Sequence, residues 1–121
     1  MVGYRIVEIK DGKVMSLFHG TGGSRIIPLN VWHKANIKLV RDGGKTAKYY
    51  DAGWHFLKSK EDADSFLNRM FRIKDSRYVV KCYVRGNIRP KEHSTKGKCW
   101  LANEIKINYL DVAEAVYGSN L

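Results

Sequence analysis

Hydrophobic and polar positions alternate along the first part of the chain, which is the pattern of half-buried β-strands. Residues 4–9 alternate in this way, and Asp11-Gly12 follows them, a dipeptide that favours a two-residue hairpin turn. Residues 14–18 then supply a returning strand. The pattern therefore predicts a β-hairpin at the start of the fold.

A helical period replaces this alternation in the middle of the chain. Ser59 is typical of a helix N-cap, and Asp62 stands three residues later, as in a capping box. Apolar residues then recur at the spacing of one helix face. They are Ala63, Phe66, Leu67, Met70 and Phe71. This spacing predicts an amphipathic helix from Ser59 to Phe71, preceded directly by a short strand at residues 53–56.

Other strand patterns lie on both sides of this helix. Residues 37–40 and 46–50 enclose a turn signal, the RDGG sequence at residues 41–44, and are predicted to form a hairpin. Residues 78–84 are rich in β-branched and aromatic side chains and form the clearest strand pattern in the chain. The pattern of residues 26–32 is ambiguous between a short helix and a turn.

The end of the chain completes the prediction. Residues 100–109 are predicted to be a final strand. Its expected core positions are Leu101, Ile105 and Ile107. Residues 111–117 are predicted to be a short helix capped by Gly118. The order of elements predicts a single α+β domain over residues 1–121, with a mostly antiparallel sheet, one main amphipathic helix and a short C-terminal helix.

Net charge narrows the choice of partner. The chain has 22 Lys and Arg residues against 12 Asp and Glu residues, a net charge of +10. This excess favours an anionic partner, which can be a nucleic acid, a nucleotide or an acidic protein surface. A contribution to solubility alone is the alternative. No apolar run approaches the ~20 residues that span a bilayer, and the first residues lack the apolar region of a signal peptide, so we expect a cytoplasmic protein that does not bind membranes.

The cysteines and histidines indicate neither a disulfide framework nor a metal site. Cys82 and Cys99 are expected to be buried thiols. The four histidines are scattered, and no pair of Cys or His residues has the close spacing of a structural zinc site. We expect no metal and no cofactor.

Two segments have the composition of a phosphate site. Residues 19–25 (HGTGGSR) combine three glycines, two hydroxyls and a guanidinium, so backbone amides can approach a phosphate while Arg25 binds it. A mobile connection is the alternative. Residues 53–56 (GWHF) place aromatic rings and an imidazole just before a helix N-terminus, which favours anions. The alternative is that Trp54 and Phe56 are core residues.

The densest basic segment is residues 85–98, which read equally well as part of a binding site or as a solvated loop. Glu104 follows it as an isolated acid. We favour the interpretation of Glu104 as a surface carboxylate that pairs with a nearby lysine.

Several of these segments resemble the phage anti-Thoeris proteins, which sequester cyclic ADP-ribose isomers. The matching segments are YRIVEIKDGKV, LFHGTGGSR, VRDGG, GWHFLKSKEDADSFL, RPKEHS and LANEIKI. The resemblance implies a homo-oligomer that binds the cyclic nucleotide signal without cleaving it, with sites at or near subunit boundaries, in the cytoplasm of an infected host. It covers nearly the whole chain.

A ligand of that kind carries a pyrophosphate and an adenine, so its site needs cationic donors and a flat surface for stacking. Candidates for the flat surface are Tyr50, Trp54 and Tyr83. The full set of predicted ligand-binding residues is His19, Arg25, Tyr50, Trp54, His55, Arg89, Lys91, His93 and Lys106. No residue is predicted to be catalytic, because no general base stands beside a nucleophile at a recognisable spacing.

Two alternatives remain. The order of His19-Gly20-Thr21, His55 and Glu104 resembles the NAD-binding and catalytic positions of the ADP-ribosyltransferase fold, but a histidine replaces the expected stacking tyrosine and few residues separate His55 from Glu104. A basic nucleic-acid-binding module is the other alternative. It is less favoured because the sequence contains no helix-turn-helix, RNA-recognition or zinc-finger pattern.

Overall fold

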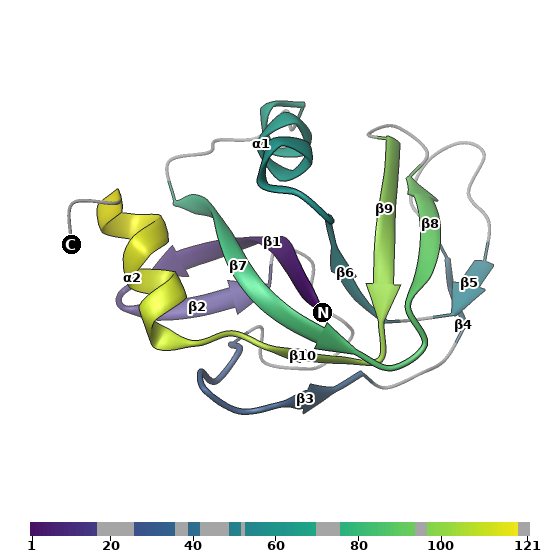
Figure 1. Cartoon of the computed structure of the whole chain (residues 1–121), viewed down its shortest axis with the longest axis horizontal. Helices are drawn as coiled ribbons and strands as arrows, with labels where there is room; N and C mark the ends of the chain where they lie inside the picture. Colours follow the sequence, from purple (N-terminus) through teal and green to yellow (C-terminus); the bar gives the residue numbers. More distant parts are fainter. Residues whose placement is uncertain are drawn as a thin grey trace.

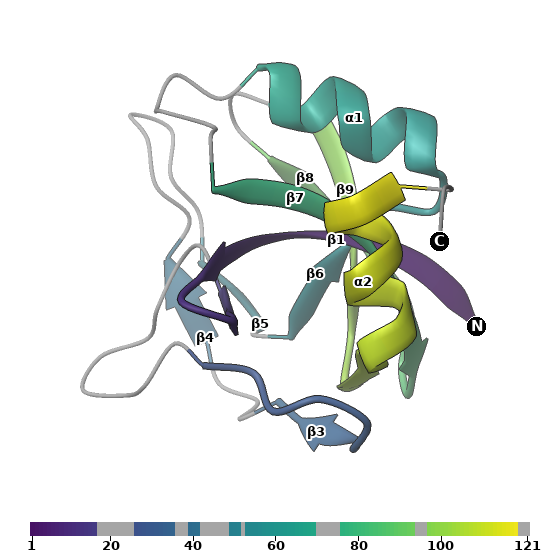
Figure 2. The same cartoon turned by 90° about the vertical axis from the view of Figure 1, so that its left-hand side faces the viewer.

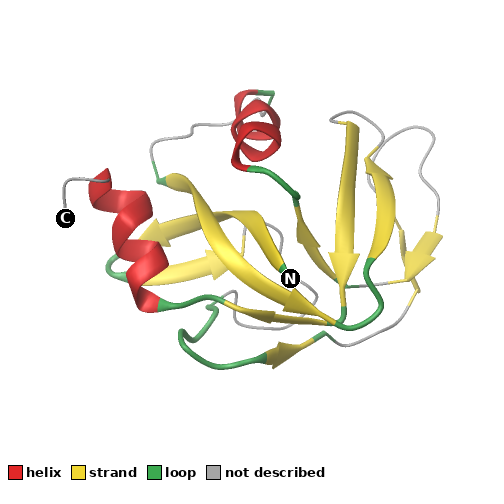
Figure 3. Cartoon of the chain, in the orientation of Figure 1, coloured by secondary structure: helices red, strands yellow, loops and turns green. Residues whose placement is uncertain are grey.

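The computed structural model of the chain is an α+β fold in which every described strand pair is antiparallel (Figure 1, Figure 3). The structure describes residues 1–16, 26–35, 39–41, 49–51, 53–69, 76–93 and 97–118. The strands are β1 (Val2–Lys10), β2 (Lys13–Ser16), β3 (His33–Lys34), β4 (Leu39–Arg41), β5 (Tyr49–Asp51), β6 (Trp54–Phe56), β7 (Arg77–Arg85), β8 (Arg89–His93), β9 (Gly97–Ala102) and β10 (Glu104–Lys106). The helices are α1 (Lys60–Asn68) and α2 (Tyr109–Tyr117).

The large sheet contains five strands in the order β2-β1-β7-β10-β3. Its centre is the pair β1 and β7, which are paired along most of their length. Between β1 and β2, Asp11 and Gly12 have φ angles of 53° and 74°, the left-handed conformation that a tight two-residue hairpin turn requires. The predicted opening hairpin is confirmed.

The small sheet contains three strands in the order β6-β9-β8, and β4 and β5 form a separate hairpin. A bridge between Tyr4 and Leu57 ties the small sheet to the large one. The Tyr4 N–H donates to the Leu57 carbonyl at 2.8 Å, and the Leu57 N–H donates to the Tyr4 carbonyl at 2.7 Å. The strand that opens the chain therefore holds both sheets together.

The main core contains residues from both sheets and from α2. Its largest fully buried side chains are Phe56, Ile105, Ile107, Val7, Val80 and Val84. Leu101 is also buried, so the three predicted core positions of the last strand region are confirmed. Cys82 and Cys99 are free and buried, as predicted. Burial raises the pKa of the Cys82 thiol to about 12, so this thiol stays protonated at neutral pH.

Helix α1 packs on the other side of the large sheet at Tyr4 and Val79, above β7 in the view of Figure 2. Ala63 is fully buried, and Phe66 packs beside it. The remaining members of this smaller apolar cluster are Tyr4, Leu57, Val79 and Cys99. α1 ends at Asn68, and the predicted helical positions 70 and 71 lie outside the described residues.

The cap of α1 forms as predicted, because the Asp62 N–H donates to the Ser59 hydroxyl oxygen at 3.1 Å. We expect Ser59→Ala to lower the free energy of unfolding by about 1 kcal/mol, since the helix N-terminus loses its side-chain acceptor. Ser65 is an exposed serine within the same helix, so Ser65→Ala is the matched control and should be neutral or slightly stabilising. Urea unfolding of both variants checks this, and equal effects would contradict it.

Two sequence predictions need correction, and the basic segment, for which two interpretations were open, is strand in part. Residues 89–93 form β8, which pairs with β9 and follows a positive-φ turn at Gly86 and Asn87. The single strand predicted for residues 100–109 is two strands. The break is at Asn103, whose N–H donates to the Gly86 carbonyl at 2.8 Å, so β9 joins the small sheet and β10 joins the large one. α2 begins at Tyr109, two residues earlier than predicted.

Elsewhere the predicted elements are present. The strand β6 precedes α1, and β7 covers the segment predicted as the clearest strand. β4 pairs with β5, as the hairpin prediction requires, although its turn at residues 42–48 lies outside the described part. Residues 29–31 bend without forming a helix, which settles the ambiguous segment as a turn.

Candidate aromatic and cationic site

The alternation of side chains along β7 divides the large sheet into two faces. Val80, Cys82 and Val84 point into the core and are fully buried. The residues between and after them therefore point to the opposite face, as do the β10 residues on either side of buried Ile105. We call this side the outer face and define it by Trp32, Lys34, Lys81, Tyr83, Arg85, Glu104 and Lys106.

Trp32 is the aromatic centre of the outer face. The Arg85 guanidinium carbon lies 3.9 Å from the centroid of the Trp32 ring, and the Lys106 ammonium lies 5.5 Å from it. Both distances are within the range of cation–π attraction. Trp32 is half-buried, immediately before β3, so the ring is fixed beside the strands that carry the two cations.

Tyr83 is the second aromatic side chain of this face. Lys106 lies 6.0 Å from its ring centroid and Lys81 lies 5.5 Å from it. A hydrogen bond with Tyr83 raises the pKa of the Lys81 ammonium, which therefore stays charged at neutral pH. Lys106 is shared between the two rings, so Trp32 and Tyr83 belong to one continuous surface.

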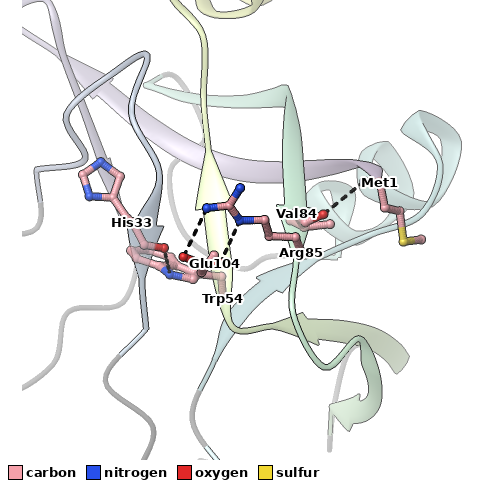
Figure 4. A network of polar contacts seen from close by, with 6 residues as sticks. All are labelled: Met1, His33, Trp54, Val84, Arg85 and Glu104. Atoms are coloured by element: carbon pink, nitrogen blue, oxygen red, sulfur yellow. Dashed lines mark hydrogen bonds and ion pairs between the residues drawn. The ribbon is translucent and has the colours of Figure 1, made fainter.

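An ion pair crosses from β7 to β10 on this surface (Figure 4). Arg85 Nε donates to Glu104 Oε2 at 2.7 Å, and Arg85 Nη2 donates to Glu104 Oε1 at 3.5 Å. The Arg85 side chain is 52% exposed and that of Glu104 is 29% exposed. The hydrogen bond from Arg85 lowers the pKa of the Glu104 carboxyl, with a smaller contribution from the charge of Lys34, so Glu104 is ionised at neutral pH.

The prediction that Glu104 is a surface carboxylate in an ion pair is thus correct, but its partner is Arg85 and not a lysine. The pairing register of β10 with its two neighbouring strands explains this choice of partner. Glu104 stands directly opposite Arg85 on one side and opposite Lys34 on the other, and the arginine is the one whose fork engages the carboxylate. The outer face as defined contains four basic side chains and this one acid.

The core side of the large sheet has a different cluster, centred on Arg5. Its Nη1 donates to the His55 carbonyl at 2.7 Å, and its Nη2 donates to the Ser16 hydroxyl at 2.8 Å. The guanidinium also lies 5.3 Å from the Trp54 ring centroid. Burial lowers the pKa of the guanidinium. Arg5 therefore ties β1 to β2 and β6, which is a structural function.

Trp54 belongs to this interior cluster. Its indole N–H donates to the His33 carbonyl at 3.0 Å (Figure 4), and its ring lies 6.3 Å from the His33 ring. The ring packs against the main core. This arrangement agrees with the alternative interpretation of Trp54 and Phe56 as core residues.

The described members of the predicted ligand-binding set lie in more than one place. His55 of β6 and Arg89 of β8 both stand opposite Leu101 of β9 in the small sheet, whereas Lys106 lies in the large sheet. Trp54 and His55 lie on β6, Arg89, Lys91 and His93 on β8, Tyr50 on β5 and Lys106 on β10. His19 and Arg25 lie outside the described residues.

Two basic residues of β8 are committed to local packing. Arg89 Nη1 donates to the Asn87 carbonyl at 2.8 Å and to Asn103 Oδ1 at 3.1 Å. Lys91 is only 7% exposed, opposite Cys99 in the register of β8 and β9. Of the predicted residues whose side chains the structure describes, Lys106 is the one that joins an exposed group of cations and aromatic rings.

Sequence reasoning missed Trp32 and Arg85 as site residues. Alternation alone could have grouped Arg85 with Lys81 and Tyr83, since all three are two positions apart in one strand. Trp32 carries no such signal, because its proximity to Lys106 depends on the pairing of β3 with β10, which are distant in sequence.

Among the described residues, no group of three or more His, Cys, Asp or Glu side chains is arranged to hold a metal ion. In the same part of the chain neither helix is long and apolar enough to cross a membrane.

Comparison of the chain with protein-family models, with curated proteins and with solved structures found no match. Function is therefore inferred from the chemistry of the outer face together with the sequence resemblance.

Proposed function

We propose that the protein binds a phosphate-bearing nucleotide on the outer face and does not cleave it. The observation that supports this most is the position of Lys106, within cation–π distance of both Trp32 and Tyr83, with Arg85 over the other part of the same surface. A nucleotide presents a flat base and an anionic phosphate side by side. The outer face presents flat rings and cations side by side.

The cations supply the phosphate contacts. Arg85 and Lys106 both approach the Trp32 ring, so a pyrophosphate over this ring can contact a guanidinium fork and an ammonium together. A hydrogen bond to a charged group contributes about 1.5 to 3 kcal/mol and a stacked base about 1 to 3 kcal/mol, so two such bonds with one stacked base correspond to a Kd between about millimolar and micromolar.

The aromatic rings and the guanidinium supply the stacking surface. A nucleobase can stack on Tyr83 or on the plane of Arg85, which is itself supported by Trp32 at 3.9 Å. Arginine planes and aromatic rings stack on any base, so this surface favours nucleotides as a class and does not select a particular base.

The resemblance to anti-Thoeris proteins makes a cyclic ADP-ribose isomer the ligand we propose first. It carries the adenine and the pyrophosphate that the outer face suits. In that case the protein sequesters an immune signal in the cytoplasm of an infected host, as a homo-oligomer. The +10 net charge supports an anionic ligand but does not select this one.

The enzyme alternative has less support from the geometry. An ADP-ribosyltransferase requires Glu104 to orient the nicotinamide ribose, whereas here its carboxylate is engaged by Arg85 on the outer face. The His55 carbonyl accepts a hydrogen bond from Arg5, which lies on the core side of the large sheet, whereas Glu104 lies on its outer face. We therefore propose binding without turnover, and NAD incubated with the protein should be recovered intact.

Replacing Lys106 tests the proposed function. We expect Lys106→Met to weaken binding of ADP-ribose about tenfold, because the variant loses a phosphate contact next to both rings. The matched control is Lys58→Met, since Lys58 lies 3.4 Å from the centroid of Trp100 on the small sheet, away from the outer face. Isothermal titration calorimetry of both variants measures the difference.

Equal losses in the two variants would mean that net charge and not this surface controls binding, which would contradict the proposal. The nucleic-acid alternative has its own signature in the same experiment. Affinity for an oligonucleotide would then rise with its length and fall steeply with salt, while a nucleotide site saturates at one ligand.

A further inference from the structure

The Arg85 to Glu104 pair occupies one of the two edges of the guanidinium that can hold a phosphate at two points. Arg85 Nε and Nη2 both face the Glu104 carboxylate, at 2.7 and 3.5 Å. These two nitrogens form a fork with which arginine can hold an oxyanion at two points. A ligand phosphate that engages this edge competes with the Glu104 carboxylate for the same atoms.

We propose that Glu104 is a built-in competitor, which holds the Arg85 fork in the free protein and is displaced when a ligand polyphosphate binds. This inference rests on the proposed function, because it names the regulation of the same site. Glu104 is then a residue that sets affinity and selects among anions, and it is not a catalytic residue.

The exposure of the pair makes displacement feasible. With 52% of the Arg85 side chain and 29% of the Glu104 side chain exposed, the ion pair is screened by water and is weak. A pyrophosphate that contacts Arg85 and Lys106 together gains two cations, whereas Glu104 holds only one of them. The exchange therefore favours a polyphosphate.

The displaced carboxylate has a second cation available. Lys34 stands opposite Glu104 in the pairing of β3 with β10, on the side away from Arg85. Its charge already acts on Glu104, since it contributes to the lowered pKa of that carboxyl. Glu104 can therefore turn from Arg85 to Lys34 without leaving an isolated charge.

The competitor also gives selectivity. A tethered carboxylate acts at a high effective concentration, so a small anion that binds Arg85 alone displaces it poorly. A ligand with two linked phosphates reaches Lys106 as well. The site is therefore expected to prefer pyrophosphate-containing nucleotides to acetate, chloride or inorganic phosphate.

The test measures binding of ADP-ribose by the wild-type protein, Glu104→Gln and Glu114→Gln. Glu114 is an exposed acid on α2, so its replacement removes the same charge away from the fork. We expect Glu104→Gln to tighten binding about two- to fivefold and Glu114→Gln to leave it within about 1.5-fold. Equal gains in affinity in both variants, or no gain in affinity in Glu104→Gln, would overturn the proposal that Glu104 competes with the ligand.

A second readout follows the carboxyl group itself by NMR. In the free protein the pKa of Glu104 should lie below its ordinary value, because Arg85 stabilises the carboxylate. Saturating ADP-ribose should raise this pKa, since Arg85 then turns to the phosphate. An unchanged pKa in the saturated protein would overturn displacement.

The outcomes separate the two proposals. If Glu104→Gln binds ADP-ribose and the wild-type protein does not, Glu104 blocks Arg85 without being displaced, and both the displacement and the proposed function of the natural chain fail. If the wild-type protein binds and Glu104→Gln is no tighter, only the competitor fails. If neither binds, both fail.

Discussion

Replacing Trp32 with alanine should weaken nucleotide binding about 10- to 100-fold while leaving the protein folded. The substitution removes the ring that supports the Arg85 plane, on which a base can stack, at 3.9 Å and that lies 5.5 Å from Lys106. A stacked base contributes about 1 to 3 kcal/mol, and the two phosphate contacts lose their support as well. Calorimetry with ADP-ribose measures the change, and thermal unfolding checks that the fold is kept.

Trp32→Phe is the informative companion variant. It keeps a ring under both cations and should recover most of the affinity. The matched control outside the outer face is Trp100→Phe, on the small sheet, which should bind as the wild-type protein does. A Trp32→Ala variant with wild-type affinity and a native melting curve would remove the outer face as the site.

Replacing Gly3 with alanine should destabilise the fold by about 1 to 3 kcal/mol, which corresponds to a melting temperature roughly 4 to 12 °C lower. A Cβ at this position would lie 2.5 Å from Cδ2 of the Phe56 ring and 3.3 Å from the Leu57 carbonyl oxygen. Phe56 is fully buried, so its ring cannot move aside without disturbing the main core. The entropy that alanine removes from the unfolded chain stabilises by only about 0.4 to 1 kcal/mol, so the clash dominates.

The double variant Gly3→Ala, Phe56→Leu distinguishes this clash from a general loss of flexibility. Leucine lacks the ring that the new methyl group would contact. The two substitutions together should therefore destabilise less than the sum of their separate effects. Additive effects in urea unfolding would show that Gly3 matters for another reason.

Local patterns were sufficient to predict most of the fold. The opening hairpin, the strand before α1, the Ser59 cap and the buried cysteines each depend on residues close together in the sequence, and each is confirmed. The break at Asn103 was not predictable in this way. It depends on a hydrogen bond to Gly86 and on the division of β9 and β10 between two sheets, which are long-range effects.

The candidate site was less predictable for the same reason. Sequence reasoning sought charge and aromatic rings in neighbouring segments, and so grouped Trp54 and His55 with a basic segment that lies on β8 of the same small sheet, and with Lys106, which lies in the large sheet. Trp54 is partly buried and packs against the main core, where its indole N–H donates to the His33 carbonyl and Arg5 lies over its ring. The outer face arises only when β3, β7 and β10 pair side by side, which places Trp32 next to Lys106.

The three tryptophans offer the most direct test of the claim that the outer face binds a nucleotide. Trp32 lies on the outer face, Trp54 in the interior cluster and Trp100 on the small sheet, so their indole N–H signals report on three separate places. In an NMR titration with ADP-ribose we expect the Trp32 signal to shift in a saturable manner while the Trp54 and Trp100 signals stay nearly unchanged. A saturable shift of Trp54 with a silent Trp32 would place the ligand at the interior residues and contradict the outer-face site.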